Sequence, residues 1–117
     1  MKFLNRAIGR LAEDLAVNAL REKGYEIIER NFSNKFGEID IIAKDKDTLV
    51  FVEVKAKTGT DFGNPEEMIS KSKLSQVRHM ADVFLAGEKA LCRIDVVAIV
   101  LNPDKSLLRL THYENVY

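Results

Sequence analysis

The chain has 117 residues, of which 18 are basic and 18 are acidic, and 46% of its residues are hydrophobic. This length suffices for one domain with a real core, and the hydrophobic fraction excludes a disordered chain. No apolar run approaches the roughly 20 residues of a membrane span, so we expect no membrane partner. The balanced charge excludes a nucleic-acid binder that is basic over its whole surface, and any such binding requires a local basic patch.

The single cysteine and the N-terminal residues indicate the cellular compartment in which we expect the protein. The segment 1–6 lacks the uninterrupted apolar core of a signal peptide. The single cysteine, Cys92, cannot form an internal disulfide and stands in an apolar run, so we expect a buried thiol and a cytoplasmic protein. Because no repeat or interdomain linker is visible, residues 1–117 are expected to form a single domain.

Hydrophobic periodicity predicts a helix first. Its apolar stripe has spacings of three and four, and consists of Ile8, Leu11, Ala12, Leu15 and Ala19. Gly24 is well placed to end this helix. A strand with the charges of an edge strand is expected over 25–32, followed by a turn over 31–37.

The rest of the chain predicts four more strands and one helix. Strands are expected over 38–44 and 48–57, a loop over 58–65, and a helix from about 66 to 86. The core stripe of that helix would be Leu74, Val77, Ala81, Phe84 and Leu85. A central strand over 92–101 and a last strand over 107–113 complete the order α-β-β-β-α-β-β, which predicts an α/β fold with a mixed sheet flanked by helices.

The second and third strands place ionisable side chains on one face. A hairpin with Lys46 and Asp47 at its tip sets Asp40 opposite Glu53 and Glu38 opposite Lys55, and alternation puts these four on the same face. Two carboxylates at a cross-strand distance of roughly 5 Å repel each other. A divalent cation such as Mg²⁺ or Mn²⁺ would offset that repulsion. The alternative is an ordinary charged and solvated hairpin face.

Three further side chains are candidates for the same site. Lys55 points the same way as Glu53 and would reach a water or a phosphate oxygen there. Glu13 borders the apolar stripe of the first helix, so it either points at the sheet or stays on the surface. Glu38 either adds a ligand or pairs with Lys55 across the hairpin.

Basic residues near these acids in the sequence are candidates to contact phosphates. They are Arg6, Arg10, Lys57, Lys71, Lys73 and Arg78. For Arg6 and Arg10 the alternative is pairing with acids, and for the other four it is a solvated helix face.

Asp95 interrupts an otherwise apolar strand. Because a buried carboxylate needs a partner, we interpret Asp95 and Arg93 as a structural ion pair rather than a catalytic pair. His112 is expected to be structural and His79 to lie on the surface. The chain has no glycine-rich phosphate loop, Ser-His-Asp signature, CxxC or HExxH, which disfavours NTPase, serine-hydrolase and zinc sites.

The constellation of Glu13, Asp40 and Glu53-Val54-Lys55 resembles the PD-(D/E)xK nuclease superfamily, whose restriction-endonuclease-like core has the order α-β-β-β-α-β. Within it, the chain looks most like the archaeal Holliday-junction resolvases. Over nearly its whole length it is similar to the small bacterial YraN-like family of uncharacterised proteins. Four stretches carry this resemblance in order, and they are residues 9–16, 37–43, 49–55 and 92–98.

The resemblance implies a role for each residue of the constellation. Asp40 and Glu53 would bind Mg²⁺ or Mn²⁺, with the backbone carbonyl of Val54 as a further ligand. Lys55 would position the attacking water, and Glu13 would complete the site directly or through water. The chain departs from the superfamily at Ile39, which stands where the Pro-Asp pair has its proline, as in many members.

The resemblance also implies a metal-dependent endonuclease that cuts DNA phosphodiesters, with branched or junction DNA as a candidate substrate. Resolution of junctions would need two sites, so a symmetric homodimer is then expected. Because one fold hosts several functions, two rival hypotheses stay open. One is a nucleic-acid-binding module with little or no catalysis, and the other is a small assembly factor that binds no nucleic acid.

Overall fold

The structure is a computed structural model that describes residues 2–59 and 69–116, and the side chains from residue 6 onward within these ranges. Its elements follow the expected order α-β-β-β-α-β-β. The helices are α1 (Lys2–Glu22) and α2 (Lys71–Leu85). The strands are β1 (Glu26–Asn34), β2 (Gly37–Asp45), β3 (Thr48–Thr58), β4 (Cys92–Leu101) and β5 (Leu107–Tyr113). In the described part of the chain, no helix is long and apolar enough to cross a membrane.

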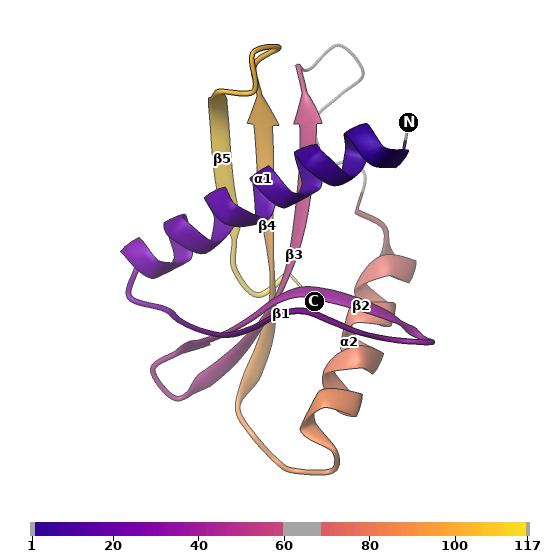
Figure 1. The fold of residues 1–117 in the computed structure, drawn as a ribbon. Helices are drawn as coiled ribbons and strands as arrows, with labels where there is room; N and C mark the ends of the chain where they lie inside the picture. Colours follow the sequence, from indigo (N-terminus) through magenta and orange to yellow (C-terminus); the bar gives the residue numbers. More distant parts are fainter. Residues whose placement is uncertain (1, 60–68, 117) are drawn as a thin grey trace.

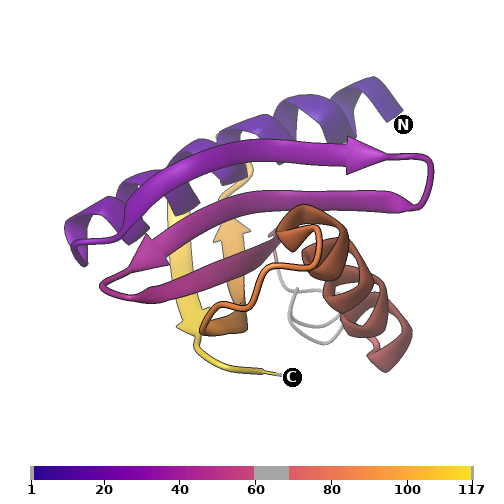
Figure 2. The same cartoon turned by 90° about the horizontal axis from the view of Figure 1, so that it is seen from below.

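The five strands form one mixed sheet in the order β1-β2-β3-β4-β5. Strands β3 and β4 run parallel, and each of the other neighbouring pairs is antiparallel. A parallel pair needs a crossover connection, and α2 lies in the connection between β3 and β4. The two helices lie on opposite sides of the sheet, with α1 across the face seen in Figure 1 and α2 on the other side, as Figure 2 shows. This architecture confirms the predicted fold class and is consistent with a restriction-endonuclease-like fold.

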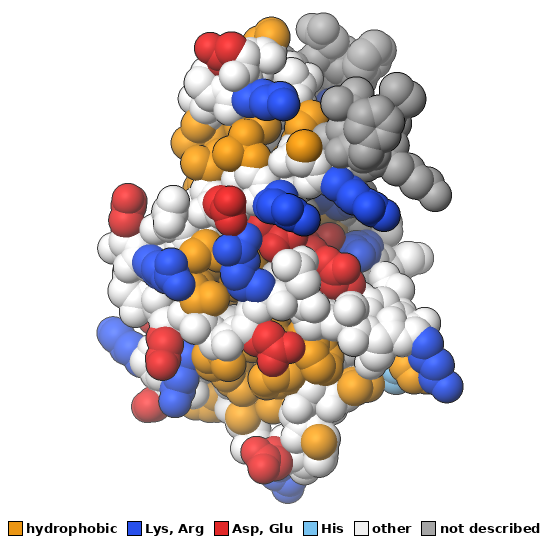
Figure 3. Space-filling view, viewed as in Figure 1, with side chains coloured by type: hydrophobic (Ala, Val, Ile, Leu, Met, Phe, Trp, Pro, Cys, Tyr) orange, Lys and Arg blue, Asp and Glu red, His pale blue; other side chains and the backbone are white. Residues whose placement is uncertain are grey.

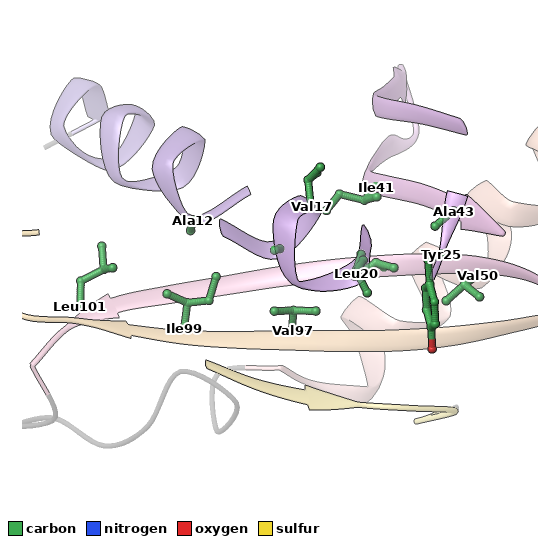
Figure 4. Close-up of a cluster of buried hydrophobic side chains, with 12 residues drawn as sticks. Ala12, Val17, Leu20, Tyr25, Ile41, Ala43, Val50, Val97, Ile99 and Leu101 are labelled. Atoms are coloured by element: carbon green, nitrogen blue, oxygen red, sulfur yellow. The ribbon is translucent and has the colours of Figure 1, made fainter. Parts of the chain in front are cut away.

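Helix α1 covers one core of the sheet (Figure 4). Its buried residues are Ala12, Ala16, Val17 and Leu20, and they pack on apolar side chains of β2, β3 and β4. The buried stripe therefore differs from the predicted one, because Val17 and Leu20 are buried while Ala19 is only partly so. Glu13 lies one turn before Val17 on the same side of the helix, and its side chain is only 15% exposed.

Helix α2 covers the second core, which contains Phe51, Val77, Met80 and other buried side chains of β2 and β4. The helix begins at Lys71, later than predicted, because the Ser70 hydroxyl accepts a hydrogen bond from the Lys73 N–H at 3.1 Å and caps it. Residues 60–68, which hold most of the predicted loop and the predicted start of this helix, lie outside the described residues.

The turn between β1 and β2 is tighter than predicted, because β1 continues to Asn34. The Asn34 side-chain oxygen accepts a hydrogen bond from the Phe36 N–H at 2.8 Å and closes the turn. Gly37 follows with φ +154°, and a Cβ there would lie 2.8 Å from the Gln76 side-chain nitrogen of α2. Only glycine meets both conditions.

The hairpin of β2 and β3 has the predicted two-residue turn, and Asp45 pairs with Thr48 beside it. The predicted register holds as far as Ile41, which pairs with Val52. Beyond that pair the ladder ends, so the predicted pairs Asp40–Glu53 and Glu38–Lys55 do not form. Past this point β2 stays paired only with β1, as far as Gly37, and β3 only with β4, as far as Thr58.

Two expectations about β4 have different outcomes. Cys92 is exposed, which corrects the predicted buried thiol, because this first residue of the strand lies outside both cores. Asp95 is fully buried and receives hydrogen bonds from Arg93 Nε at 3.0 Å, from a ring nitrogen of His112 at 2.7 Å and from the Asn115 N–H at 2.9 Å. The predicted Asp95–Arg93 ion pair is thus confirmed, and His112 belongs to the same buried network, while its structural role stays a prediction. His79 is exposed, as predicted.

Candidate active site

Asp40 lies at the fork where β2 separates from β3. Its neighbours Ile39 and Ile41 belong to the two different cores, which hold the backbone on both sides. The Asp40 carboxylate accepts a hydrogen bond from the Val54 N–H at 2.8 Å. The Asp40 side chain thus gives the Val54 N–H of β3 a hydrogen-bond acceptor at the point where the β2–β3 ladder has ended.

Glu53 is the most buried acid at this fork, with 4% exposure. One carboxylate oxygen lies 3.7 Å from Lys73 Nζ of α2. The other oxygen, Oε2, is buried and accepts no hydrogen bond from any of the described residues. Burial raises the pKa of Glu53, while the charges of Lys73 and Lys55 oppose that rise. An unsatisfied buried carboxylate oxygen is costly, and it marks a position that a ligand would fill.

The pKa of Asp40 is strongly raised, to about 8. Burial is the main cause, followed by the negative charge of Glu53, and the hydrogen bond from Val54 opposes the rise. A hydrogen bond with Glu38 and the charge of Glu13 raise it further. At neutral pH, and without a cation, this group of acids therefore retains a proton.

Glu13 and Glu38 complete an acidic cluster with Asp40. One carboxylate oxygen from each of the three lies within 4.8 Å of the others. Glu38 thus lies with Asp40, and within the described residues it forms no ion pair with Lys55. Figure 3 shows acidic side chains gathered beneath α1 near the middle of this face, with basic side chains beside them.

The donor set of this cluster fits a hard divalent cation. All of its side-chain donors are carboxylate oxygens, which suit Mg²⁺ or Mn²⁺ rather than a soft metal. Glu53 is not one of the three grouped acids, but its unpartnered Oε2 is a free ligand atom. Burial and then the negative charge of Glu53 raise the pKa of Asp40, and a cation would neutralise that charge. Asp95, His112 and Glu114 form a second group of possible ligands, but Arg93 already pairs with both of its acids.

The structure separates the basic candidates. Lys55 is half-buried on β3, and its positive charge lowers the pKa of Glu53. Lys73 forms an ion pair with Glu53. Lys57 follows on β3, and Lys71 is exposed in the first turn of α2. Arg78 lies elsewhere, because it lines a small pocket with Cys92, which pairs with Leu49 near the start of β3.

Arg30 is a residue of the site that sequence reasoning missed. Its guanidinium lies 2.7 Å from an Asp14 carboxylate oxygen and 3.5 Å from a Glu13 carboxylate oxygen. The sequence signal was only a basic residue in a charged edge strand. Its partners lie on α1, and only the packing of α1 against β1 brings them together.

The comparisons with known proteins identify the family of this chain. The model of the uncharacterised protein family UPF0102 matches residues 12–99, which is more than half of the chain. The chain belongs to the UPF0102 family. The resemblance to the YraN-like family is thereby confirmed, and the matched range includes Glu13, Asp40, Glu53 and Lys55.

UPF0102 proteins of several bacteria are similar to this chain over nearly their whole length. The protein of Dictyoglomus turgidum is 36% identical over 116 residues, which are 97% of this chain and 98% of that protein. The protein of Caldicellulosiruptor saccharolyticus is 39% identical over 115 residues, covering 96% of this chain and 98% of that protein. The protein of Pelotomaculum thermopropionicum is 36% identical over 120 residues and covers both chains completely.

Proposed function

We propose that this UPF0102 protein is a Mg²⁺- or Mn²⁺-dependent endonuclease that hydrolyses DNA phosphodiesters. The observation that carries the proposal is the pair of carboxylates at the fork, where the buried Glu53 keeps one oxygen unpartnered beside Asp40. Burying two acids together costs stability, and without a cation the site keeps a proton on Asp40 and pairs one Glu53 oxygen with Lys73. A cation would replace that proton and fill the unpartnered Glu53 oxygen, so we interpret the pair as a cation site.

In this proposal the acids would hold the cation from three elements. Asp40 and Glu53 would be its ligands from the two separating strands, and Glu13, which is grouped with Asp40, would complete the donor set from α1, directly or through water. The cation would lower the pKa of a bound water and neutralise negative charge on the phosphate. The Val54 N–H holds one Asp40 oxygen in place, so this carboxylate is oriented in advance.

The two lysines near Glu53 would have different tasks. Lys55 would orient the attacking water and stabilise the negative charge that develops on the phosphate. Lys73 pairs with one Glu53 oxygen and leaves the other to the cation. Lys57 and Lys71 would contact phosphates on either side of the site.

Branched DNA is the substrate that we propose, because the motif set resembles the archaeal Holliday-junction resolvases. Such a reaction needs two coordinated cuts, so we propose a symmetric homodimer with one site in each chain. Light scattering at micromolar concentration tests the assembly independently of cleavage.

Cleavage of a labelled DNA panel tests the activity. Single-stranded, duplex, flap and four-way-junction DNA would be incubated with Mg²⁺ or Mn²⁺ and with wild type, Asp40→Asn or Glu53→Gln. Asp47→Asn is the matched control, because this acid is exposed at the turn at the other end of the hairpin. We expect metal-dependent cutting by wild type and control, and a loss of at least about 100-fold in both site variants.

Other outcomes would overturn the proposal. Equal cutting by Asp40→Asn would indicate a contaminating nuclease. Salt-dependent DNA binding without cutting would favour a binding module, and the absence of any such binding would favour an assembly factor.

A further inference from the structure

A groove of about 670 Å³ between α1 and β1 leads into the acidic cluster. Three arginines line it, and they are Arg6 and Arg10 of α1 and Arg30 of β1. Glu13 and Glu38 belong both to this groove and to the acidic cluster. A molecule in the α1–β1 groove would therefore touch the candidate active site.

Gly9 lines the groove in the interior of α1. Glycine weakens a helix interior relative to alanine, so it needs a reason there. The fold supplies none, because a Cβ added at Gly9 would meet no atom of the described residues within 4 Å. The missing side chain thus leaves room on the groove side of the helix that the protein itself does not fill. Close approach of a ligand to the backbone is a use of glycine that fits this open position.

The arginines suit an anionic ligand. Arg6 and Arg10 are exposed, lie one turn apart on α1 and form no ion pair with any described residue. Arg30 is held across the groove by Asp14 and Glu13. Acidic and basic side chains of the lining balance, since Glu13, Asp14 and Glu38 face the three arginines. The groove attracts a polyanion only when its acids are neutralised.

We propose that the α1–β1 groove holds the sugar-phosphate backbone of one DNA strand, with Gly9 at the point of closest approach and Arg6 and Arg10 on its phosphates. This inference rests on the proposed function, and it adds the path of the strand into the site. It also requires that a divalent cation at the acidic cluster strengthens DNA binding, because the cation reverses the charge balance of the groove.

Equilibrium binding of labelled flap and duplex DNA, followed by fluorescence anisotropy in Ca²⁺, tests the groove. Gly9→Leu fills it, and we expect affinity to fall at least tenfold while the melting temperature stays equal or rises. Gly9→Ala should show a smaller loss with the same gain in stability. Arg6→Gln and Arg10→Gln should each weaken binding and lower the slope of log K against log salt by about 1.

Matched controls lie on the same helix. Asn18→Leu adds the same side chain at an exposed position half a turn around α1 from Gly9, and Arg21→Gln removes one charge at the far end. Both should bind DNA like wild type. Unchanged Mn²⁺ binding by Gly9→Leu would show that the acidic cluster is intact.

The inference and the proposed function fail differently. If Gly9→Leu and Arg10→Gln bind DNA like wild type while Asp40-dependent cleavage persists, the groove is not the path of the strand and the nuclease proposal stands. If wild type binds no DNA in Ca²⁺ but cuts it in Mg²⁺ or Mn²⁺, only the groove proposal is overturned; if it neither binds nor cuts DNA, both are. Equal DNA affinity in Ca²⁺ and in EDTA would contradict the charge argument for the groove.

Discussion

The Asp40 carboxylate accepts a hydrogen bond from the Val54 N–H at 2.8 Å, at the point where β2 and β3 part. This bond replaces a ladder bond with a side-chain contact, so the strands can separate without leaving that β3 donor unpaired. It also holds Asp40 near the buried Glu53, whose negative charge helps to raise the pKa of Asp40 to about 8. One local interaction thus stabilises the fork and brings the two acids together.

The stability of the metal-free protein should fall as the pH rises. Burial raises the pKa of Asp40 from 3.8 to about 8, so between these values the folded chain binds more protons than the unfolded chain. Stability therefore decreases across this window, by several kcal/mol at about 1.4 kcal/mol per pH unit. Urea denaturation in EDTA at pH 5 and pH 9 measures it. Asp40→Asn should reduce the change in the free energy of unfolding between these pH values, whereas Asp47→Asn should leave it as in wild type. An equal change in all three proteins would contradict the role of Asp40.

A divalent cation should stabilise the wild type in a pH-dependent way. At a Mn²⁺ concentration of 100 times Kd the gain is about 2.7 kcal/mol. Apparent affinity should increase from pH 6 to pH 8, because the cation must displace the proton that Asp40 retains below a pKa of about 8. Isothermal titration calorimetry measures both. Asp40→Asn and Glu53→Gln should bind Mn²⁺ weakly at every pH, and wild-type affinity in either variant would place the cation elsewhere.

Asp95 should have the opposite pH dependence. Burial works against its ionisation, but hydrogen bonds from His112, Arg93 and the Asn115 backbone outweigh burial and lower the pKa of Asp95. Its contribution is present above the usual pKa near 4 and is lost as the pH falls through the lower folded value. Asp95→Asn should cost roughly 3 to 5 kcal/mol, because it leaves Arg93 without its buried partner. Acid and urea denaturation measure this; an unchanged urea midpoint would show that the network is not structural.

Gly37 should resist substitution for two separable reasons. A Cβ at this position meets the Gln76 side chain at 2.8 Å, and φ is +154°. We expect Gly37→Ala to cost about 1 to 3 kcal/mol. Adding Gln76→Ala removes the steric contact but not the backbone strain, so it should restore only part of the stability in a double-mutant cycle. Full additivity of the two substitutions would mean that the contact carries no cost.

The sequence by itself determined the strands, the hairpin turn and the acids of β2 and β3. Alternation with period two is a local property, and a two-residue turn sets the register from Asp45–Thr48 to Ile41–Val52. The same local reasoning placed Asp95 with Arg93, because side chains two residues apart on a strand share a face.

Only the tertiary structure decided where the register ends and which distant side chains meet. Past Asp40 each of β2 and β3 pairs only with its outer neighbour, β1 or β4, which the hairpin pattern cannot show. Likewise, the packing of α1 turned Glu13 toward the sheet and brought Arg30 to it, while α2 brought Lys73 to Glu53. Such contacts depend on how whole elements pack on the sheet. Periodicity within one element predicts only which of its faces is buried, and it can miss by a neighbouring residue.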